Sequence, residues 1–280
     1  MTGSVRWAFN FAKWEPSEKE LLLATSCIQL EEKIRIAKFV FQKDFKAALV
    51  GRLLTRKFIK EASGLPYNEI CVTRDVNNKP IFEHHSVPKL NFNVSHQGSL
   101  TVFAGETRKV NIGVDVMKLE YTGGKSIDEF FKIMNRQFTD NEWKVIKGCS
   151  SSTNQDKISR FCRHWALKEA YTKALGMGLT IDLRKIDFKI KSSLEKNKII
   201  QDTVVYVNDE RQNFLFEESL VDNEHVVTVA LENQSPYSES NLDLMKFKIL
   251  TPADLLRDVS PLLPEDINYC KNYFSKDVHR

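Results

Sequence analysis

The sequence lacks the features on which small secreted proteins and membrane-spanning proteins depend. Its five cysteines are odd in number, scattered and never spaced as C-x-x-C, so neither a disulfide framework nor a structural zinc site is expected. No apolar run approaches the roughly 20 residues that span a bilayer. Arg6, Asn10 and Lys13 interrupt the aromatic N-terminal stretch, which argues against the apolar core of a signal peptide. We therefore expect a cytoplasmic protein.

A large excess of one charge is also absent. The 41 Lys and Arg against 37 Asp and Glu leave a net charge of +4, too small for a protein that coats nucleic acid. With 42% hydrophobic residues, the 280 residues suffice for one large or two medium globular domains. Positive charge is concentrated at 31–60, where nine basic residues face three acids, 9 − 3 = +6. This stretch is either a solvated helix face or a site for a polyanionic ligand.

Hydrophobic spacing predicts two successive halves with the same order, helices first and strands after. Helical spacing at 17–60 precedes strands at 70–73, 90–95, 100–104 and 110–116; helices at 127–134, 140–146 and 161–175 precede strands at 186–190, 203–207, 213–217 and 226–231. The fold class is therefore α+β, with helices packed on a small, mainly antiparallel sheet in each half. We place the halves at 1–119 and 120–234, and expect 235–280 to form an extension packed on the surface.

The strand at 110–116 carries one acidic side chain. Its valines and isoleucine share one face, which leaves Asn111, Gly113, Asp115 and Met117 on the other. A carboxylate in so apolar a strand is costly to bury unless a cation or donors receive it, so Asp115 either binds such a group or faces solvent at the strand end. Gly113 predicts close approach of a ligand or of another backbone.

A second candidate group lies on the helix at 161–175, which Gly176 is expected to end. Trp165, Glu169 and Lys173 are spaced i, i+4 and i+8 and so share a face. Glu169 and Lys173 are either an ordinary exposed helix pair or, since the tryptophan indicates partial burial, a metal ligand or base and a phosphate partner.

Two polar segments in the first half add candidate ligand contacts. One is the turn Arg74, Asp75, Val76, Asn77, Asn78 and Lys79; the other is Asn93, Val94, Ser95, His96 and Gln97, whose last three residues we expect at a turn before Gly98. Ser95 and His96 are strand neighbours that point to opposite faces, which disfavours a hydrolase. His96 either contacts phosphate or metal or is a hydrogen-bonded structural histidine. Together these groups predict a ligand with several phosphates and a divalent metal, magnesium rather than zinc because no His/Cys set is present.

Three of these segments, in order, resemble a known family. Asn93–His96, Ile112–Asp115 and Trp165–Leu179 resemble the motifs of the Sfp-type 4'-phosphopantetheinyl transferases, with G-[IV]-D and W-x-x-K-E-[AS]-x-x-K some fifty residues apart. Val5–Phe9 and Gly113–Lys118 are similar to the animal members, and the resemblance reaches about Leu231.

This resemblance implies transfer of the 4'-phosphopantetheine arm of coenzyme A to a serine of apo acyl carrier protein domains, with release of 3',5'-ADP. The implied carriers are of the fatty acid synthase and aminoadipate-semialdehyde dehydrogenase types. The implied fold is a pseudo-twofold pair of α+β halves with the active site between them, in a monomer. By motif position, Asp115 and Glu169 are the implied magnesium ligands, Glu169 also the base for the carrier serine, and Lys173 the stabiliser of pyrophosphate charge.

The resemblance also implies which residues bind coenzyme A: Arg35, the turn Arg74–Lys79, Asn93–His96, Asp115, Glu169 and Lys173. Many bacterial members have a third acid where this chain has Met117, and Gln97 is our candidate for the missing oxygen ligand. The competing hypotheses are a non-catalytic module that binds coenzyme A or a carrier domain, and an RNA-binding protein. The full set Asp115, Glu169 and Lys173 argues against the first, and the absence of a stacking motif against the second.

Overall fold

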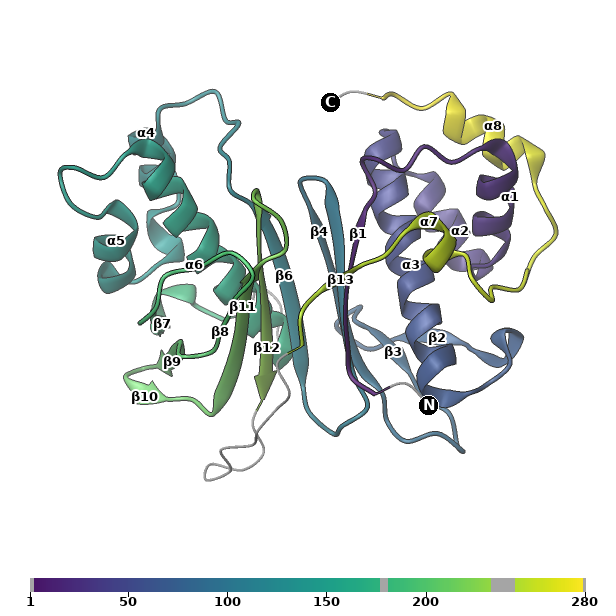
Figure 1. Cartoon of the computed structure of the whole chain (residues 1–280), viewed down its shortest axis with the longest axis horizontal. Helices are drawn as coiled ribbons and strands as arrows, with labels where there is room; N and C mark the ends of the chain where they lie inside the picture. Colours follow the sequence, from purple (N-terminus) through teal and green to yellow (C-terminus); the bar gives the residue numbers. More distant parts are fainter. Residues whose placement is uncertain (1–2, 177–180, 233–244, 279–280) are drawn as a thin grey trace. The chain divides into compact units, whose positions relative to one another are not determined.

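The computed structural model describes residues 3–176, 181–232 and 245–278, which belong to two compact units, Met1–Lys109 with Phe247–Arg280 and Val110–Lys246 (Figure 1). The helices are α1 (Glu18–Ser26), α2 (Leu30–Ala37), α3 (Gln42–Ser63), α4 (Ile127–Ile133), α5 (Asp140–Lys147), α6 (Asn154–Leu175), α7 (Pro252–Leu255) and α8 (Ile267–Phe274), with short 3-10 turns at Tyr67–Glu69, Asn135–Gln137 and Leu183–Lys185. The strands are β1 (Val5–Asn10), β2 (Val72–Arg74), β3 (Pro80–Phe82), β4 (Asn91–Gln97), β5 (Leu100–Glu106), β6 (Ile112–Lys118), β7 (Ile186–Lys189), β8 (Ile199–Ile200), β9 (Val204–Val207), β10 (Glu210–Arg211), β11 (Phe214–Leu220), β12 (His225–Glu232) and β13 (Lys248–Ile249).

The first unit packs the long helix α3 against a four-stranded sheet of order β13-β1-β5-β4. β1 pairs antiparallel with β5 and parallel with β13, so β1 is an inner strand of the sheet. Gly51 of α3 allows close packing on β4, since a Cβ there would lie 3.3 Å from Val94. Gly64, in the left-handed region at φ 73°, ends the helix. The resulting core includes Val5, Trp7 and Phe9, which lie on one face of β1.

The second unit repeats that design with α6 on the sheet β6-β12-β11-β8. α6 is 22 residues long, begins with a capping box at Thr153 and ends at Gly176 in the left-handed region. Figure 1 shows α6 running alongside β6 and β12. Two apolar clusters fill the space between helix and sheet, one around Phe161 and one around Tyr171.

The predicted α+β class with small, mainly antiparallel sheets is confirmed in both units. The predicted boundary after residue 119 differs from the observed division, because β6 pairs with β12 and therefore belongs to the second unit. Residues 247–278 do more than cover a surface: β13 extends the sheet, and Leu250, Leu255, Cys270 and Tyr273 enter the first unit's core. The five cysteines are free, as expected.

Within the described ranges, 3–176, 181–232 and 245–278, no helix has both the length and the apolar character needed to cross a bilayer.

Candidate active site

Asp115, Glu169 and Lys173 come together between β6 and α6 of the second unit. The Asp115 side chain is buried, at 6% exposure for the residue, and its Oδ1 accepts a 2.6 Å hydrogen bond from Lys173 Nζ. Lys173 Nζ also donates to the Val114 carbonyl at 3.2 Å. Glu169, one helical turn before Lys173, feels the charge of both partners. A solvent-facing Asp115 and an isolated, exposed Glu169–Lys173 pair are therefore both wrong.

Gly113 makes this meeting possible. A Cβ at position 113 would lie 2.0 Å from the Ala170 carbonyl oxygen and 2.5 Å from the Ala174 nitrogen, so only glycine lets the helix backbone approach the strand this closely. The predicted close approach at Gly113 is confirmed, and its partner is the backbone of α6. Asp115, two residues further along the same strand face, is thereby held against the helical turn that carries Glu169 and Lys173.

The electrostatics of Glu169 suit a proton acceptor. Burial raises the pKa of its carboxyl above the ordinary value; the nearby Lys173 ammonium opposes that rise, and the Asp115 carboxylate adds to it. Glu169 remains half-buried and so accessible from outside. A carboxylate with a raised pKa is a stronger base than an exposed one, which is the property that proton removal from a hydroxyl requires.

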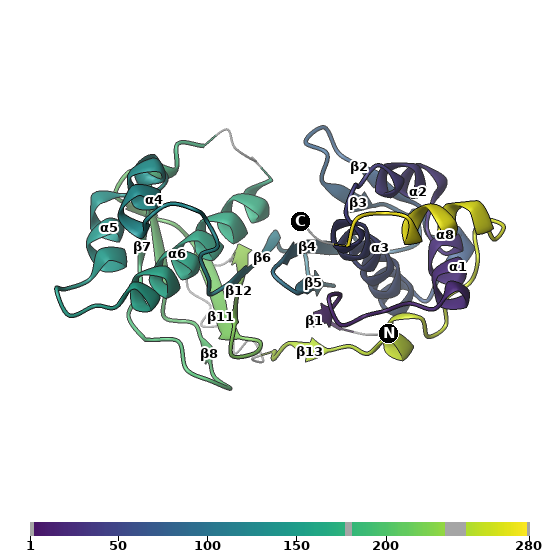
Figure 2. The same cartoon turned by 90° about the horizontal axis from the view of Figure 1, so that it is seen from above.

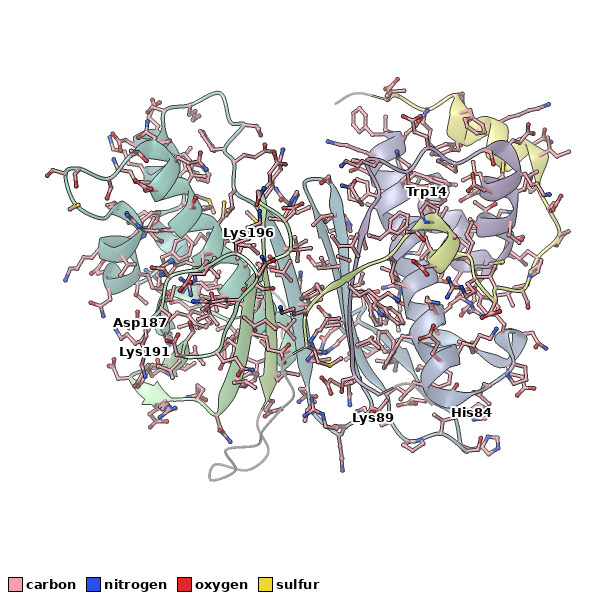
Figure 3. The ribbon with its side chains drawn as sticks, in the orientation of Figure 1. Trp14, His84, Lys89, Asp187, Lys191 and Lys196 are labelled. Atoms are coloured by element: carbon pink, nitrogen blue, oxygen red, sulfur yellow. The ribbon has the colours of Figure 1, made fainter. Side chains whose placement is uncertain are left out.

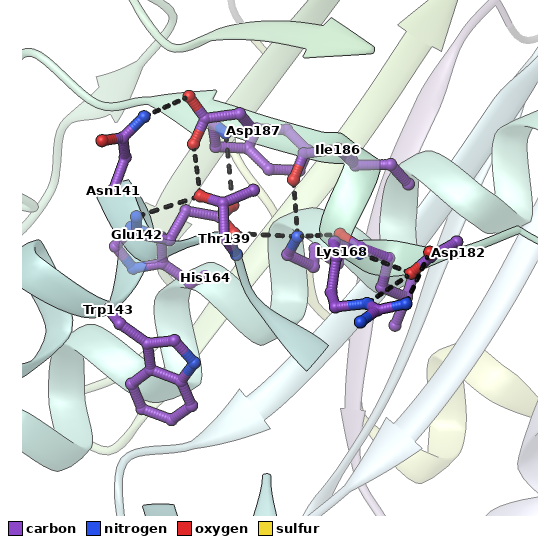
Figure 4. Close-up of polar contacts among 12 residues, drawn as sticks. Thr139, Asn141, Glu142, Trp143, His164, Lys168, Asp182, Ile186 and Asp187 are labelled. Atoms are coloured by element: carbon purple, nitrogen blue, oxygen red, sulfur yellow. Dashed lines mark hydrogen bonds and ion pairs between the residues drawn. The ribbon is translucent and has the colours of Figure 1, made fainter. Parts of the chain in front are cut away.

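Lys168, the other lysine of the same motif, has a different role (Figure 4). Its side chain is 1% exposed, pairs with Glu142 at 2.9 Å, and donates to the carbonyls of Leu183 and Ile186 at 2.7 Å each. Burial lowers the pKa of Lys168 and raises that of Glu142, while each partner's charge opposes the shift of the other. Lys168 thus joins α6 to the start of α5 and to the turn before β7. Met177, Gly178 and Leu179, at the end of the motif, lie outside the described residues.

The residue at the position of the missing acid is part of a core. Met117 packs against the apolar cluster around Phe161 and Val226, so it contributes packing on the β6 face that carries Asp115. Among the described residues, no group of three or more His, Cys, Asp and Glu side chains could hold a metal ion. Asp115 and Glu169 thus supply two carboxylates near Lys173 in the second unit.

The first unit contains two adjoining cavities lined by cationic side chains. One has a volume of about 430 Å³ and is lined by Glu31, Glu32, Arg35 and Arg74 among others. The second has about 580 Å³; Arg35, Lys38, Arg52 and His96 contribute its polar lining, and Phe39, Ala47 and Gly51 part of its apolar lining. Arg35, at the last turn of α2, belongs to both. An aromatic and small-residue floor beside several cations suits a ligand that carries both a ring system and phosphates.

Three arginines in this region lie close enough for their positive charges to interact. Arg52 pairs with the buried Glu32 at 3.0 Å. Burial lowers the pKa of Arg52, and the Glu32 carboxylate opposes this, while Arg35 lowers it further. The pKa of Arg74 is likewise lowered by burial and then by the charges of Arg52 and Arg35. Like charges kept this close favour an anion between them.

The predicted turn at 74–79 is present. The Asp75 side chain accepts from the backbone N–H groups of Asn77 and Lys79, both at 2.9 Å, and Asn78 takes a left-handed backbone at φ 62°. Arg74 Nη1 donates to the Asn78 carbonyl at 2.6 Å. Burial lowers the pKa of Lys79; Asp75 opposes the shift, and Lys89, on the β3–β4 connection in Figure 3, adds to it. Val76, at the tip, is fully exposed.

The segment 93–97 is a strand to its end, which corrects the expected turn at residues 95–97. β4 runs through Gln97, and the hairpin turn consists of Gly98 and Ser99. Val94 and His96 face the larger cavity. Asn93, Ser95 and Gln97 lie on the opposite face of the strand, so only alternate residues of the predicted set line that cavity.

The basic stretch at 31–60 is neither a uniform solvated face nor a uniform ligand site. Arg56 is fully buried and donates to the Tyr67 carbonyl at 2.7 Å, and Lys46 donates to the Trp14 carbonyl at 2.8 Å. Lys38, Phe39 and Arg52 line the larger cavity, although sequence reasoning did not single them out. The sequence carried no signal for Arg52, because its partner Glu32 lies on a different helix and the pair forms only in the fold.

Comparison with known proteins identifies the class. Residues 12–108 match the family "4'-phosphopantetheinyl transferase, N-terminal", and residues 111–230 match the "4'-phosphopantetheinyl transferase superfamily". The chain belongs to this superfamily, whose reaction is the transfer of the phosphopantetheine arm to carrier proteins, and it is an enzyme of this kind.

Individual members of the superfamily are similar to this chain over most of its length. The chain is 42% identical to the L-aminoadipate-semialdehyde dehydrogenase-phosphopantetheinyl transferase of Xenopus laevis, over 98% of this chain and 93% of the relative. It is 38% identical to the Homo sapiens protein of the same name, over 95% and 89% of the two chains. A phosphopantetheinyl transferase of Thraustochytrium sp. is 33% identical over 82% of this chain and 78% of its own length.

Proposed function

We propose that the chain takes the 4'-phosphopantetheine arm from coenzyme A, places it on a serine of an apo carrier protein and releases 3',5'-ADP. The observation that carries this proposal is the meeting of Asp115, Glu169 and Lys173 at one place between β6 and α6. A module that only binds coenzyme A or a carrier domain has no need of a half-buried carboxylate with a raised pKa beside a lysine.

The cationic cavities of the first unit supply the binding part of the proposal. Arg35 and Arg74 provide positive charge in their lining, and His96 lines the larger cavity. Lys79 adds a positive charge at the other end of the turn that begins at Arg74. Coenzyme A combines an adenine ring with a 3'-phosphate and a pyrophosphate, which matches an apolar floor beside several cations. We assign the 3'-phosphate to the Arg74–Lys79 turn with help from His96.

The chemical step follows from the second unit's residues. Glu169 removes the proton from the carrier serine hydroxyl as the serine oxygen forms a bond to the β-phosphorus, the phosphorus of the pyrophosphate that bears the pantetheine arm. The bond from that phosphorus to the bridging oxygen breaks, and 3',5'-ADP leaves with the electron pair. The proton stays on Glu169 until solvent accepts it. Lys173 stabilises the negative charge that develops on the pyrophosphate oxygens.

A divalent metal fits the donor set at this place. Asp115 and Glu169 are carboxylates on facing elements, and oxygen donors without histidine or cysteine suit magnesium. Asp115 and Glu169 would hold it, and Gln97 is our candidate for a third oxygen. When bound, magnesium neutralises charge on the phosphate oxygens.

The names of the relatives extend the proposal to partners. We infer carrier domains of the aminoadipate-semialdehyde dehydrogenase type as substrates, and also those of the fatty acid synthase type. A cytoplasmic monomer remains our prediction.

The test is mass spectrometry of an apo carrier domain after incubation with the full chain, coenzyme A and magnesium. The carrier should gain one phosphopantetheine group with the parent protein and with Glu210→Gln, a matched change at an exposed glutamate on β10. Glu169→Gln should slow the transfer by about 10² or more, and a chelator should stop it. A folded Glu169→Gln protein with parental turnover would refute the assignment. Binding of coenzyme A without any transfer would favour the binding module.

A further inference from the structure

Helix α2, which carries the cavity residue Arg35, has little stability of its own. It is eight residues long, and its N-cap residue, Gln29, makes no side-chain capping hydrogen bond. Helices shorter than about 12 residues are marginal in isolation, so tertiary contacts must fix the position of α2. One such contact is the buried Ile36, and another is the ion pair between Glu32 and Arg52 on the cavity side.

Further contacts to α2 come from the far end of the sequence. Tyr269, on α8, donates its hydroxyl to the Lys33 carbonyl at 2.8 Å, and the Lys33 ammonium lies 4.7 Å from the centre of the Tyr269 ring. Asp266, the N-cap of α8, pairs with Lys33 at 3.6 Å. Figure 2 shows α8 lying across this part of the first unit, where it contacts α1, α2 and α3. Residues 266–269 thus hold the middle of α2.

The last turn of α2 is held by Lys276. Its ammonium donates to the carbonyl of Ala37 at 2.8 Å and to that of Phe39 at 2.6 Å. The final carbonyls of a helix have no partner within the helix, and a cation there also interacts favourably with the helix dipole. Lys276 therefore caps α2 from more than two hundred residues away in sequence. The neighbouring Asp277 carbonyl accepts from the Gln42 N–H at 2.9 Å, which fixes the start of α3 as well.

The C-terminal end of α2, which Lys276 caps, also forms part of the wall of the larger cavity. Arg35 lies in the last turn of α2, and Lys38 and Phe39 follow directly; all three line the larger cavity. We propose that Lys276 is a positioning residue for coenzyme A binding: by capping α2 it holds Arg35, Lys38 and Phe39 in place around the ligand. This inference rests on the proposed function, since it takes coenzyme A as the ligand of that cavity.

The experiment compares Lys276→Met with Lys271→Met in the full chain. Both changes remove one positive charge from the same segment, but Lys271 is exposed on α8 and the hydrogen bonds that fix α2 do not involve its side chain. Hydrogen exchange without ligand should become about tenfold faster at 30–41 in Lys276→Met, and remain near parental elsewhere in the first unit. Calorimetric titration should show coenzyme A binding weakened by about five- to tenfold. Turnover at saturating coenzyme A should stay within about twofold. Lys276→Arg, which keeps a cation with several donors, should restore most of the affinity.

Three results would overturn the proposal. Exchange and affinity in Lys276→Met that match Lys271→Met would show that the cap does not hold α2. Faster exchange spread evenly over α1, α3 and the sheet would show general destabilisation only. Faster exchange at 30–41 with unchanged affinity would show that the capped end of α2 does not matter for binding. If the parent itself fails to bind coenzyme A, the proposed function fails instead, and Lys276 as positioning residue falls with it, while the exchange data still report whether Lys276 holds α2.

Discussion

The two lysines of the motif on α6 should affect different properties when they are replaced. Loss of Lys168 should mainly lower stability, and loss of Lys173 should mainly lower turnover. Replacing Lys168 by Met keeps the length and apolar stem of the side chain and removes its ammonium. The change deletes the contacts to Leu183, Ile186 and Glu142 and leaves the Glu142 carboxylate buried without its cation. Glu142 keeps its two backbone donors, the N–H groups of Thr139 and Phe188. Breaking a buried ion pair in this way costs about 3–5 kcal/mol, a large part of the roughly 5–15 kcal/mol that stabilises a typical domain.

Lys173→Met is the matched change five residues later. Its side chain is 28% exposed but that of Asp115 is only 8% exposed, so water can replace only part of what Asp115 loses, and the cost in unfolding free energy should be about 1–3 kcal/mol, less than for Lys168. Turnover should instead fall by about 10² or more, because the pyrophosphate charge loses its partner. Lys168→Met should keep most of its turnover at a temperature where it remains folded.

Equilibrium urea unfolding followed by tryptophan fluorescence measures the unfolding free energy, with Trp143 and Trp165 reporting on the second unit and Trp7 and Trp14 on the first. The double variant Lys168→Met/Glu142→Gln should recover at least about 1 kcal/mol of the loss, because the stranded charge is gone. A loss below about 1 kcal/mol for Lys168→Met would refute the account of the buried pair. Parental turnover in Lys173→Met would refute its assigned role.

Three further outcomes follow from named contacts. Arg74→Gln should raise the KM for coenzyme A more than it lowers kcat, and the difference from the parent should shrink with dephospho-coenzyme A; an equal loss with both substrates would exclude Arg74 from the 3'-phosphate site. Gln97→Ala should raise the magnesium concentration needed for half-maximal activity, and an unchanged magnesium titration would remove Gln97 from the metal site. Burial lowers the pKa of His164 to about 4, below the value near 6.5 of an exposed histidine, so the unfolded chain binds more protons between these values. Unfolding free energy should therefore fall by up to about 3 kcal/mol as pH drops through this window, and His164→Asn should flatten that slope in urea titrations at several pH values.

Much of the second unit's site could be predicted because its signal is local. The spacing of Trp165, Glu169 and Lys173 places them on one helix face whatever the rest of the fold, and Gly113 indicated a close approach before its partner was known. The same reasoning gave Lys168 no role, because its ion-pair partner Glu142 lies on α5, a different helix that a loop separates from α6. Long-range pairs of this kind leave no periodic trace.

The first unit was harder to predict for physical reasons. β1 is buried on both faces and paired on both edges, so it lacks the alternation that indicates a strand. The cavity residues Arg52 and Lys38 belong to a basic stretch in which Arg56 and Lys46 are buried for structural reasons, and composition cannot separate the two kinds. At 93–97, turn chemistry at Gly98 was assigned to the preceding residues, although a two-residue hairpin lets β4 continue to its edge.

The parallel pairing of β13 with β1 sets an order for biosynthesis. The second unit, Val110–Lys246, is contiguous, whereas the first is completed only by residues that follow it. A ribosome adding about 5–20 residues per second needs roughly 7 to 27 seconds for the intervening 246 − 109 = 137 residues. During that interval one edge of β1 is an unpaired template for other strands, and the core lacks Cys270 and Tyr273. The nascent first unit is therefore the part of this enzyme that most needs a chaperone, and the second unit can fold while it waits.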